Sequence, residues 1–289
     1  MRLDGRRESS NVDDRRRSGG MKKAGGIGIG AIVVALLIGF LTGNNPLNIL
    51  GNMDMGSMTQ GTEQTSDREF TAEEQAFATF SKQVLAGTED VWSEVFKANG
   101  LTYTPPTMVL FTGGVQTGCG GATSQVGPFY CSADQCLYID LSFFTQMKNE
   151  MGAGGDFAYA YVIAHEVGHH VQHLLGTLDK AHAQMSKLSQ EKANKISVRI
   201  ELQADFYAGV WAYHDNKMFS SIEDGDIEEA LNCASKIGDD YLQKQARGYV
   251  QPESFTHGTA KQRERWLRLG LSTGDLRRGD TFSISESQL

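Results

Sequence analysis

A stretch without any charged residue lies between Lys23 and Asp54, and it constrains the fold of this chain more than any other feature. Its apolar centre runs from Ile27 to Leu41, and small uncharged residues extend it on both sides to residues 24–43. About 20 residues of helix are needed to cross the roughly 30 Å hydrocarbon core of a bilayer. The composition therefore predicts one transmembrane helix over residues 24–43, in contact with the lipid bilayer.

Two other interpretations of this segment are open. A cleaved signal peptide would have a shorter apolar core followed by a small-residue cleavage site, and the residues after Leu41 offer only a poor one. A buried core helix is disfavoured by the glycines at positions 25, 26, 28, 30 and 39, because membrane helices tolerate glycine better than soluble helices do. We favour the transmembrane anchor.

The charge distribution predicts the orientation of this anchor. Residues 1–23 carry eight Lys or Arg against four Asp or Glu, a balance of +4, which leaves −12 for the rest of a chain with a net charge of −8. Basic flanks of membrane spans remain in the cytoplasm. We therefore predict a single-pass protein of the cytoplasmic (inner) membrane, with residues 1–23 as a basic cytoplasmic tail and the remainder extracytoplasmic. The acidic balance has the wrong sign for a nucleic-acid partner, and none is expected.

Composition divides the rest of the chain into a linker and one domain. Residues 44–68 are rich in Gly, Asn, Ser and Thr and show no hydrophobic periodicity, which is typical of a flexible linker. With 40% hydrophobic and 21% charged residues, the chain as a whole has a globular balance. Residues 69–289 are predicted to form a single folded domain.

Hydrophobic periodicity predicts an α+β fold for this domain, mostly helical with a small sheet. A helix is expected over residues 70–96, strands over 107–112 and 135–144, and a glycine-rich loop over 113–127. The second half is predicted to be helical over residues 157–175, 189–213, 227–244 and 259–269. By analogy with other clefts, the strand at 136–140 is expected to offer an edge to an extended substrate.

The residues with the clearest chemistry are His165-Glu166-Val167-Gly168-His169, an H-E-x-x-H pattern within a predicted helix. Histidines four residues apart project from one helix face about 6 Å apart along the axis, so both can bind one ion. This pattern is typical of zinc sites in which the glutamate is the general base for water. A preceding apolar turn directs the pair toward the domain interior.

A catalytic zinc takes three protein ligands, so a third is required. His173 is too far along the helix from His165, and His170 lies on a different face. The best remaining donor is Glu201 on the next long predicted helix, and Asp205 shares its face four residues later. We expect Asp205 to accept the other ring N–H of a ligand histidine, which fixes its tautomer. A solvated pair of acidic residues is the alternative.

These motifs carry a family resemblance. HEVGHH followed by ELQAD resembles the glutamate-ligand zincins, and SVRIELQAD with the later THGT and Arg263 is similar to the membrane-associated M48-type peptidases. The order GRRES, one apolar span, GPFYC, YIDLSFF, HEVGHHVQ, ELQAD, ALN and SFTHGT resembles the bacterial neutral zinc metallopeptidase family. This resemblance covers nearly the whole chain except the linker.

The resemblance implies a zincin-like catalytic fold for residues 69–289 with one Zn²⁺ per chain. It implies His165, His169 and Glu201 as metal ligands and Glu166 as the catalytic base. It also suggests His257 as the catalytic donor that stabilises the oxyanion, with Arg263 nearby as a supporting cation. An ordinary surface or capping histidine is the alternative for His257.

The function that follows is that of a membrane-anchored zinc metalloendopeptidase, a hydrolase that acts on a peptide or protein substrate. Glu166 would take a proton from the attacking water and return it to the leaving amine. The alternatives are a zinc-binding membrane-tethered scaffold without turnover, and a zinc amide hydrolase that acts on cell-wall or other non-peptide material. The sequence specifies neither the substrate nor a protein partner.

The chain has four cysteines, Cys119, Cys131, Cys136 and Cys233, an even number that suits an oxidising compartment. Four cysteines allow three pairings, and their spacing matches no paired zinc-binding pattern. Cys136 and Cys233 stand where the family pattern has other residues. We therefore hypothesise a Cys119–Cys131 disulfide and an additional Cys136–Cys233 disulfide.

Overall fold

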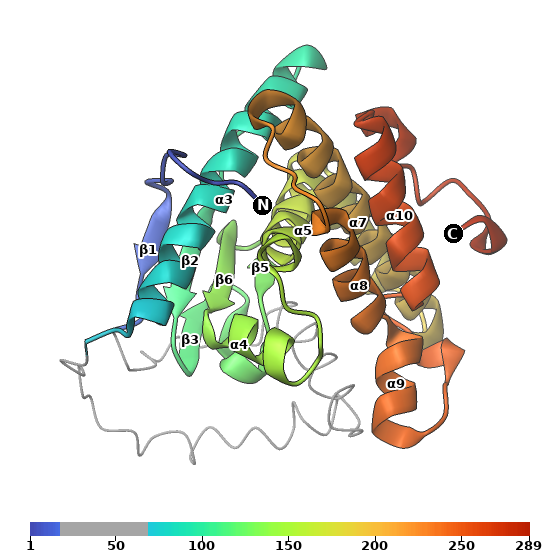
Figure 1. The fold of residues 1–289 in the computed structure, drawn as a ribbon. Helices are drawn as coiled ribbons and strands as arrows, with labels where there is room; N and C mark the ends of the chain where they lie inside the picture. Colours follow the sequence, from blue (N-terminus) through green and yellow to red (C-terminus); the bar gives the residue numbers. More distant parts are fainter. Residues whose placement is uncertain (18–68) are drawn as a thin grey trace. The chain divides into compact units, whose positions relative to one another are not determined.

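The computed structural model of the chain describes residues 1–17 and 69–289, which divide into two compact units (Figure 1). The helical unit comprises residues 1–9, 80–105 and 144–289. The sheet unit comprises residues 106–143 and the described residues between 10 and 79. Helix α3 (Ala72–Ala98) begins in the second of these and continues in the first, in agreement with the helix predicted over 70–96.

Two long helices, α5 and α7, form the centre of the helical unit (Figure 1). Helix α5 is buried over nearly its whole length, and α7 packs against both α5 and α10. The elements after α3 in this part of the chain are α4 (Ser142–Asn149), α5 (Asp156–Leu174), α6 (Thr177–Met185), α7 (Gln190–Phe219), α8 (Asp226–Lys236), α9 (Asp239–Arg247), η3 (Pro252–Ser254), α10 (Ala260–Thr273), η4 (Leu276–Arg278) and η5 (Glu286–Gln288). The mostly helical α+β class is confirmed.

The helix predicted over 227–244 is wrong in one respect, because it is two helices. The chain leaves the helical conformation at Gly238, and α9 starts at Asp239. The Asp239 carboxylate accepts hydrogen bonds from the backbone N–H groups of residues 256–258, so the start of α9 is held by a distant loop. Helix α10 begins with a capping box between Thr259 and Gln262.

The sheet unit contains a four-stranded sheet with the order β1-β2-β6-β5. Its strands are β1 (Val12–Asp14), β2 (Thr107–Phe111), β5 (Phe129–Cys131) and β6 (Cys136–Asp140). Strands β1, β2 and β6 are parallel, whereas β5 is antiparallel to β6. Strand β6 therefore lies inside the sheet, with Tyr138 paired to Val109 on one side and to Phe129 on the other. The expectation that β6 offers a free edge to a substrate is wrong.

The predicted strand over 135–144 is also shorter than expected. It ends at Asp140, whose side chain accepts the backbone N–H of Ser142 at 3.0 Å, and α4 begins there. The glycine-rich stretch contains a separate hairpin of β3 (Gly114–Thr117) and β4 (Gly120–Thr123), followed by η2 (Ser124–Val126). The core of the sheet unit consists of Val109, Phe111, Val115, Ala122, Val126, Phe129, Cys131 and Tyr138.

A disulfide joins Cys119 to Cys131 in the sheet unit, in agreement with the first hypothesised pair. The second pair is wrong: among the described residues, Cys136 and Cys233 are free cysteines. Cys233 lies fully buried in α8, where burial raises the pKa of its thiol to about 12. Cys136 pairs in register with Cys131 across the β5–β6 hairpin, but it keeps its own thiol.

Residues 1–17 belong to the two folded units. Arg6 forms an ion pair with the buried Asp215 of α7 at 2.8 Å, and its guanidinium stacks over the ring of Phe219. Strand β1 pairs with β2 through three register positions. The described part of the predicted basic tail, residues 1–17, thus packs against later residues of the chain, and its cytoplasmic location stays a prediction.

The predicted membrane span over 24–43 and the linker over 44–68 lie outside the described residues. Within 1–17 and 69–289, no helix is long and apolar enough to cross a bilayer.

Candidate metal centre

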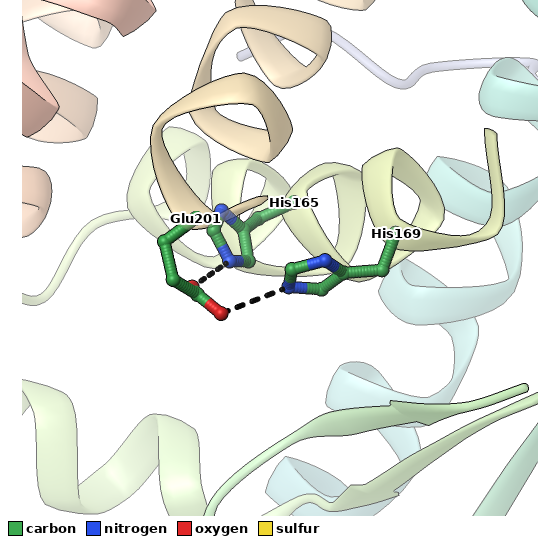
Figure 2. A group of neighbouring side chains, drawn as sticks. All are labelled: His165, His169 and Glu201. Carbon is green, nitrogen blue, oxygen red and sulfur yellow. Dashed lines mark hydrogen bonds and ion pairs between the residues drawn. The ribbon is translucent and has the colours of Figure 1, made fainter. Parts of the chain in front are cut away.

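Helices α5 and α7 bring together the two histidines of the H-E-x-x-H pattern and Glu201. Figure 2 shows both imidazole rings directed toward the carboxylate of Glu201. The Nε2 atom of His165 lies 3.1 Å from Oε2 of Glu201, and the Nε2 atom of His169 lies 3.5 Å from Oε1. One ligand atom from each of the three residues lies within 4.8 Å of the others.

The close contact of α5 with α7 depends on Gly168, between the two histidines. A Cβ atom at this position would lie 2.9 Å from the backbone oxygen of Ala204 and 3.2 Å from its Cα. Ala204 stands between Glu201 and Asp205 on α7. The glycine therefore allows the two backbones to approach at the level where the candidate metal ligands are attached.

Asp205 holds the far side of the His165 ring, as the sequence predicts. Its Oδ1 atom lies 2.8 Å from Nδ1 of His165 and accepts the hydroxyl of Tyr161 at 2.6 Å. The guanidinium of Arg263 donates to both carboxylate oxygens, at 2.8 Å and 2.9 Å. Because a carboxylate accepts the Nδ1 proton, Nε2 is the His165 nitrogen that is directed toward Glu201 and that loses its proton when a metal ion binds.

Gln172 has the corresponding position beside His169. Its Oε1 atom lies 2.9 Å from Nδ1 of His169, one turn further along α5. The amide of Gln172 donates to the backbone oxygen of Ile200 at 2.7 Å and to Oε1 of Gln203 at 3.1 Å. Each histidine therefore has an acceptor on Nδ1 and presents Nε2 to the centre.

The charges of this cluster are strongly coupled. Burial opposes the charge on His165, but the Asp205 and Glu201 carboxylates outweigh it and raise its pKa to about 10. Burial lowers the pKa of His169 to about 4. The pKa values of Glu201 and Asp205 are lowered despite burial, that of Glu201 by the two histidines and that of Asp205, to about 2, by Arg263 and His165. In the absence of a metal ion, a proton on His165 therefore balances part of the negative charge.

This donor set fits zinc. Two imidazoles and one carboxylate, with a fourth position for water, form a common set of ligands for catalytic zinc. With zinc–ligand bonds of about 2.0–2.1 Å, tetrahedral ligand atoms are about 3.3 Å apart. The separations of 3.1 Å and 3.5 Å between the histidine nitrogens and the Glu201 oxygens bracket this value.

His257 lies on a loop that Asp239 holds in place. The Oδ2 atom of Asp239 accepts the backbone N–H groups of Thr256, His257 and Gly258, and its Oδ1 atom lies 3.1 Å from Nδ1 of His257. Although burial opposes its charge, Asp239 and then Glu201 raise the pKa of His257. The sequence-predicted His257 is thus electrostatically coupled to the metal centre.

Arg263 lies behind the ligand histidine, bonded to Asp205, and close enough to His257 to lower its pKa by charge repulsion. It is 2% exposed and contacts Asp205, Tyr161 and Nδ1 of His165, on the side of the ring that faces away from Glu201. It therefore supports the carboxylate that orients His165, and these contacts do not include His257.

Glu166 lies next to His165 on α5 and is 7% exposed.

The other histidines of this helix lie outside the group of ligands, as predicted. His170 is buried and bonded to the backbone oxygen of Thr104, and His173 pairs with Asp179. Within the described residues, a second group of acidic side chains is close enough together to hold an ion. It consists of Asp156, Asp226 and Glu229, but the amino group of Met1 lies 2.6 Å from a carboxylate oxygen of Asp156.

Sequence reasoning missed Tyr161, Gln172, Gln203 and Asp239. A signal was present for two of them, because Tyr161 is four residues before His165 and Gln172 is three residues after His169, both on the ligand face. Asp239 acts through contacts with residues 256–258, and Gln203 acts through a contact with residue 279. No local sequence pattern shows these contacts.

A cavity of about 410 Å³ is lined by residues of α6, α7 and the C-terminal segment, and the three ligand residues do not line it.

Comparisons with known proteins agree with the chemistry of this centre. The family described as "Putative neutral zinc metallopeptidase" matches residues 1–282. The chain is 46% identical over 291 residues to the uncharacterized protein YpfJ of Escherichia coli strain K12, which covers 99% of this chain and 100% of that protein. It is 46% identical over 194 residues to the uncharacterized protein Rv2575 of Mycobacterium tuberculosis strain H37Rv, or 64% of each chain. No solved structure matches the chain significantly.

Proposed function

Because the chain belongs to the neutral zinc metallopeptidase family, we propose that it hydrolyses peptide bonds at a zinc centre held by His165, His169 and Glu201. One observation carries the proposal. Both histidines present Nε2 to the same carboxylate at 3.1 Å and 3.5 Å, while each Nδ1 atom has an acceptor of its own. In a coincidental pair of histidines on one helix, the two Nδ1 atoms would not both have a buried hydrogen-bond acceptor.

When bound, a zinc ion supplies a Lewis acid that polarises the scissile carbonyl and activates water. The side chains of the chain supply the rest. Glu166, beside the first ligand, takes the proton from the attacking water and returns it to the leaving amine. His257, whose raised pKa favours its charged form, donates to the oxygen on which negative charge develops.

The proposal includes a zincin-like arrangement with one zinc per chain. It is supported by the packing of the H-E-x-x-H helix α5 against α7, which carries the third ligand and Asp205. Glu166 favours an enzyme over a zinc-binding scaffold, because a scaffold needs the ligands but not the base. The substrate class is a peptide or protein, with a non-peptide amide as the alternative outcome of the test.

Attachment to the lipid bilayer through residues 24–43 is a further part of the proposal. The contacts of residues 1–17 bear on its geometry, since Arg6 pairs with Asp215 and β1 pairs with β2. These contacts cannot form across a bilayer. They therefore argue against the predicted single-pass orientation, with residues 1–23 inside and the rest outside, and favour an arrangement in which both flanks of residues 24–43 are on one side of the membrane.

The test uses the full chain, because residues 1–17 pack on the later residues. Zinc content and cleavage of a mixed peptide library are compared for wild type, Glu166→Gln and the control Glu191→Gln, which removes an exposed glutamate from α7. We expect all three proteins to bind zinc, and only Glu166→Gln to lose cleavage.

The other outcomes separate the alternatives. Zinc bound by all three proteins without any cleavage favours the scaffold or the non-peptide amide hydrolase. Cleavage that persists in Glu166→Gln contradicts the role of Glu166. A wild-type chain that does not bind zinc overturns the assignment of the centre itself.

A further inference from the structure

We infer that Gln172 and Gln203 are positioning residues that hold the metal ligand His169 in the tautomer with its lone pair on Nε2, and that the C-terminal segment fixes them through Gly279. The inference rests on the proposed metal centre, but not on peptidase activity. It is carried by the direction of the hydrogen bonds in a buried chain of side chains.

The direction of this chain is set by two groups that can only accept hydrogen bonds. The backbone oxygen of Gly279 receives a bond of 2.6 Å from Gln203, and the backbone oxygen of Ile200 receives one of 2.7 Å from Gln172. A carbonyl oxygen has no proton to donate. The NH₂ group of each glutamine must therefore face the carbonyl, which removes the usual ambiguity between the two ends of an amide.

The remaining bonds then have one consistent direction. With its NH₂ group on Gly279, Gln203 can offer only its oxygen to Gln172, which donates to it at 3.1 Å. Gln172 in turn has only its oxygen left for His169, at 2.9 Å from Nδ1. The imidazole must donate there, so the proton is on Nδ1 and the lone pair on Nε2 faces Glu201.

Burial makes this order costly to break. Gln172 is fully buried and Gln203 is 5% exposed. A buried amide without partners is strongly unfavourable, and an apolar side chain of the same length would fill the space without that risk. Two buried glutamines linked by a hydrogen bond are therefore better explained by the orientation that they impose on His169 than by packing.

The far end of the chain lies in the segment after α10. Residues around Gly279 are held on α7 by Arg199, whose guanidinium donates to the backbone oxygens of Thr281 and Ile284. The hydroxyl of Thr281 donates back to the backbone oxygen of Arg199 at 2.7 Å. The C-terminal segment thereby carries a structural element of the metal centre, far in sequence from both ligand motifs.

Two substitutions of Gln172 separate positioning from packing, because the two roles predict opposite orders. Gln172→Met keeps the length and apolar fit but removes the acceptor for Nδ1. Gln172→Glu keeps an acceptor but buries a charge and loses both donated bonds. Positioning predicts that the methionine variant loses zinc affinity by about 10–100-fold while the glutamate variant stays closer to wild type. Packing alone predicts that the methionine variant binds as wild type does.

The measurement is competition for Zn²⁺ with a chromophoric chelator, on the full chain, together with ¹H–¹⁵N spectra of the metal-free, histidine-labelled protein. We expect the Nδ1–H tautomer of His169 in wild type and in Gln172→Glu, and its loss in Gln172→Met. Thermal unfolding of each variant shows that it is folded. If Gln172→Met is folded and keeps both the affinity and the tautomer, the inference is overturned.

Two further variants test the outer part of the chain. Gln203→Met removes the link to Gly279. Gly279→Ala adds a Cβ atom 2.5 Å from the buried ring of Phe206 and so displaces the accepting carbonyl without removing any side-chain group. Both variants should lose zinc affinity, as Gln172→Met does, but by a smaller factor. The control is Gln243→Met, which removes a buried glutamine that bonds to Ser254 and Gln251 instead of to a histidine.

The outcomes distinguish this inference from the proposed function. A wild-type chain that binds zinc but cuts no peptide, with the expected order of affinities, supports the inference and contradicts the peptidase. If wild type cleaves peptides and all folded variants bind zinc with equal affinity, the peptidase is supported and the inference is contradicted. A loss of affinity in Gln243→Met equal to that in Gln203→Met would also overturn the inference, because the effect would then be general.

Discussion

The carboxylate of Asp205 and the guanidinium of Arg263 form a buried two-point ion pair, with Nε 2.8 Å from Oδ2 and Nη2 2.9 Å from Oδ1. Asp205 is fully buried, and Arg263 is 2% exposed. The same carboxylate accepts from Tyr161 and orients His165, so helices α5, α7 and α10 meet at one acidic group. The stability of this part of the helical unit and the orientation of His165, a proposed metal ligand, therefore depend on the same pair.

Removal of the Arg263 charge should be strongly destabilising. In Arg263→Met, Asp205 keeps its buried negative charge without its main cation, which we expect to cost about 3–5 kcal/mol of unfolding free energy. Urea unfolding of the metal-free chain measures this loss. The control Arg268→Met removes an exposed arginine from the same helix and should change the free energy of unfolding by less than about 0.5 kcal/mol. Equal effects of the two substitutions would contradict the importance of the pair.

Gly168 should be intolerant of even one methyl group. Alanine would gain about 1 kcal/mol of helix propensity. However, its Cβ atom would lie 2.9 Å from the Ala204 backbone oxygen, and overpacking of a buried contact costs about 1–3 kcal/mol. We expect the steric cost to prevail, so Gly168→Ala lowers both stability and zinc affinity, and Gly168→Ser lowers them further. A more stable Gly168→Ala variant with unchanged zinc affinity would show that the two helices can separate freely.

Much of the metal centre could be predicted from the sequence because its information is local. The spacing of His165 and His169 fixes their shared helix face, and the spacing of Glu201 and Asp205 does the same on α7. The need for a third ligand then connects the two helices. The predicted helix boundaries were accurate where hydrophobic periodicity was long, as in α3 and α5.

The rest depends on contacts that no local pattern encodes. Gln172 and Gln203 were missed because their partners are backbone oxygens, one of them at Gly279. The resemblance implied Arg263 as a supporting cation, but its two-point contact with Asp205 behind His165 follows from the packing of α10 on α7. The charge balance of residues 1–23 predicts a basic tail beside a membrane span, but it does not show that Arg6 pairs with the buried Asp215.

The stability of the metal-free chain should have a maximum near pH 6.5. The pKa of His165 is raised to about 10, so between about pH 6.5 and 10 the folded chain holds a proton that the unfolded chain has lost. Its stability therefore falls as the pH rises through this range. The pKa of His169 is lowered to about 4, so below about pH 6.5 the unfolded chain gains a proton that the folded chain does not. Stability therefore also falls as the pH drops toward 4.

Urea midpoints of the metal-free chain between pH 4 and 10 measure this profile. Zinc binding at pH 7.5 should release about one proton, because a ligand histidine must be neutral. Calorimetry in buffers of different ionisation enthalpy detects that proton. Zinc binding without proton release would show that His165 is already neutral in the metal-free chain.

The two flanks of residues 24–43 should lie on the same side of any membrane to which the chain is attached. Arg6 and Asp215 come from opposite sides of this stretch in the sequence, yet their side chains are 2.8 Å apart. Val12 and Met108 likewise face each other in adjacent strands. A hydrocarbon core of about 30 Å between the two flanks would exclude both contacts.

Cysteine labelling tests this prediction. Asp4→Cys and Glu94→Cys place thiols at exposed positions of the two flanks, in a chain whose Cys136 and Cys233 are replaced by serine. A membrane-impermeant maleimide is applied to cells before and after permeabilisation. Both positions should react under the same condition, whereas opposite reactivity would mean that the contacts of residues 1–17 do not form in the membrane-bound chain. Reaction of both in intact cells would also place the Cys119–Cys131 disulfide in the oxidising compartment where such bonds persist, and protection of both would put it where reduction is expected.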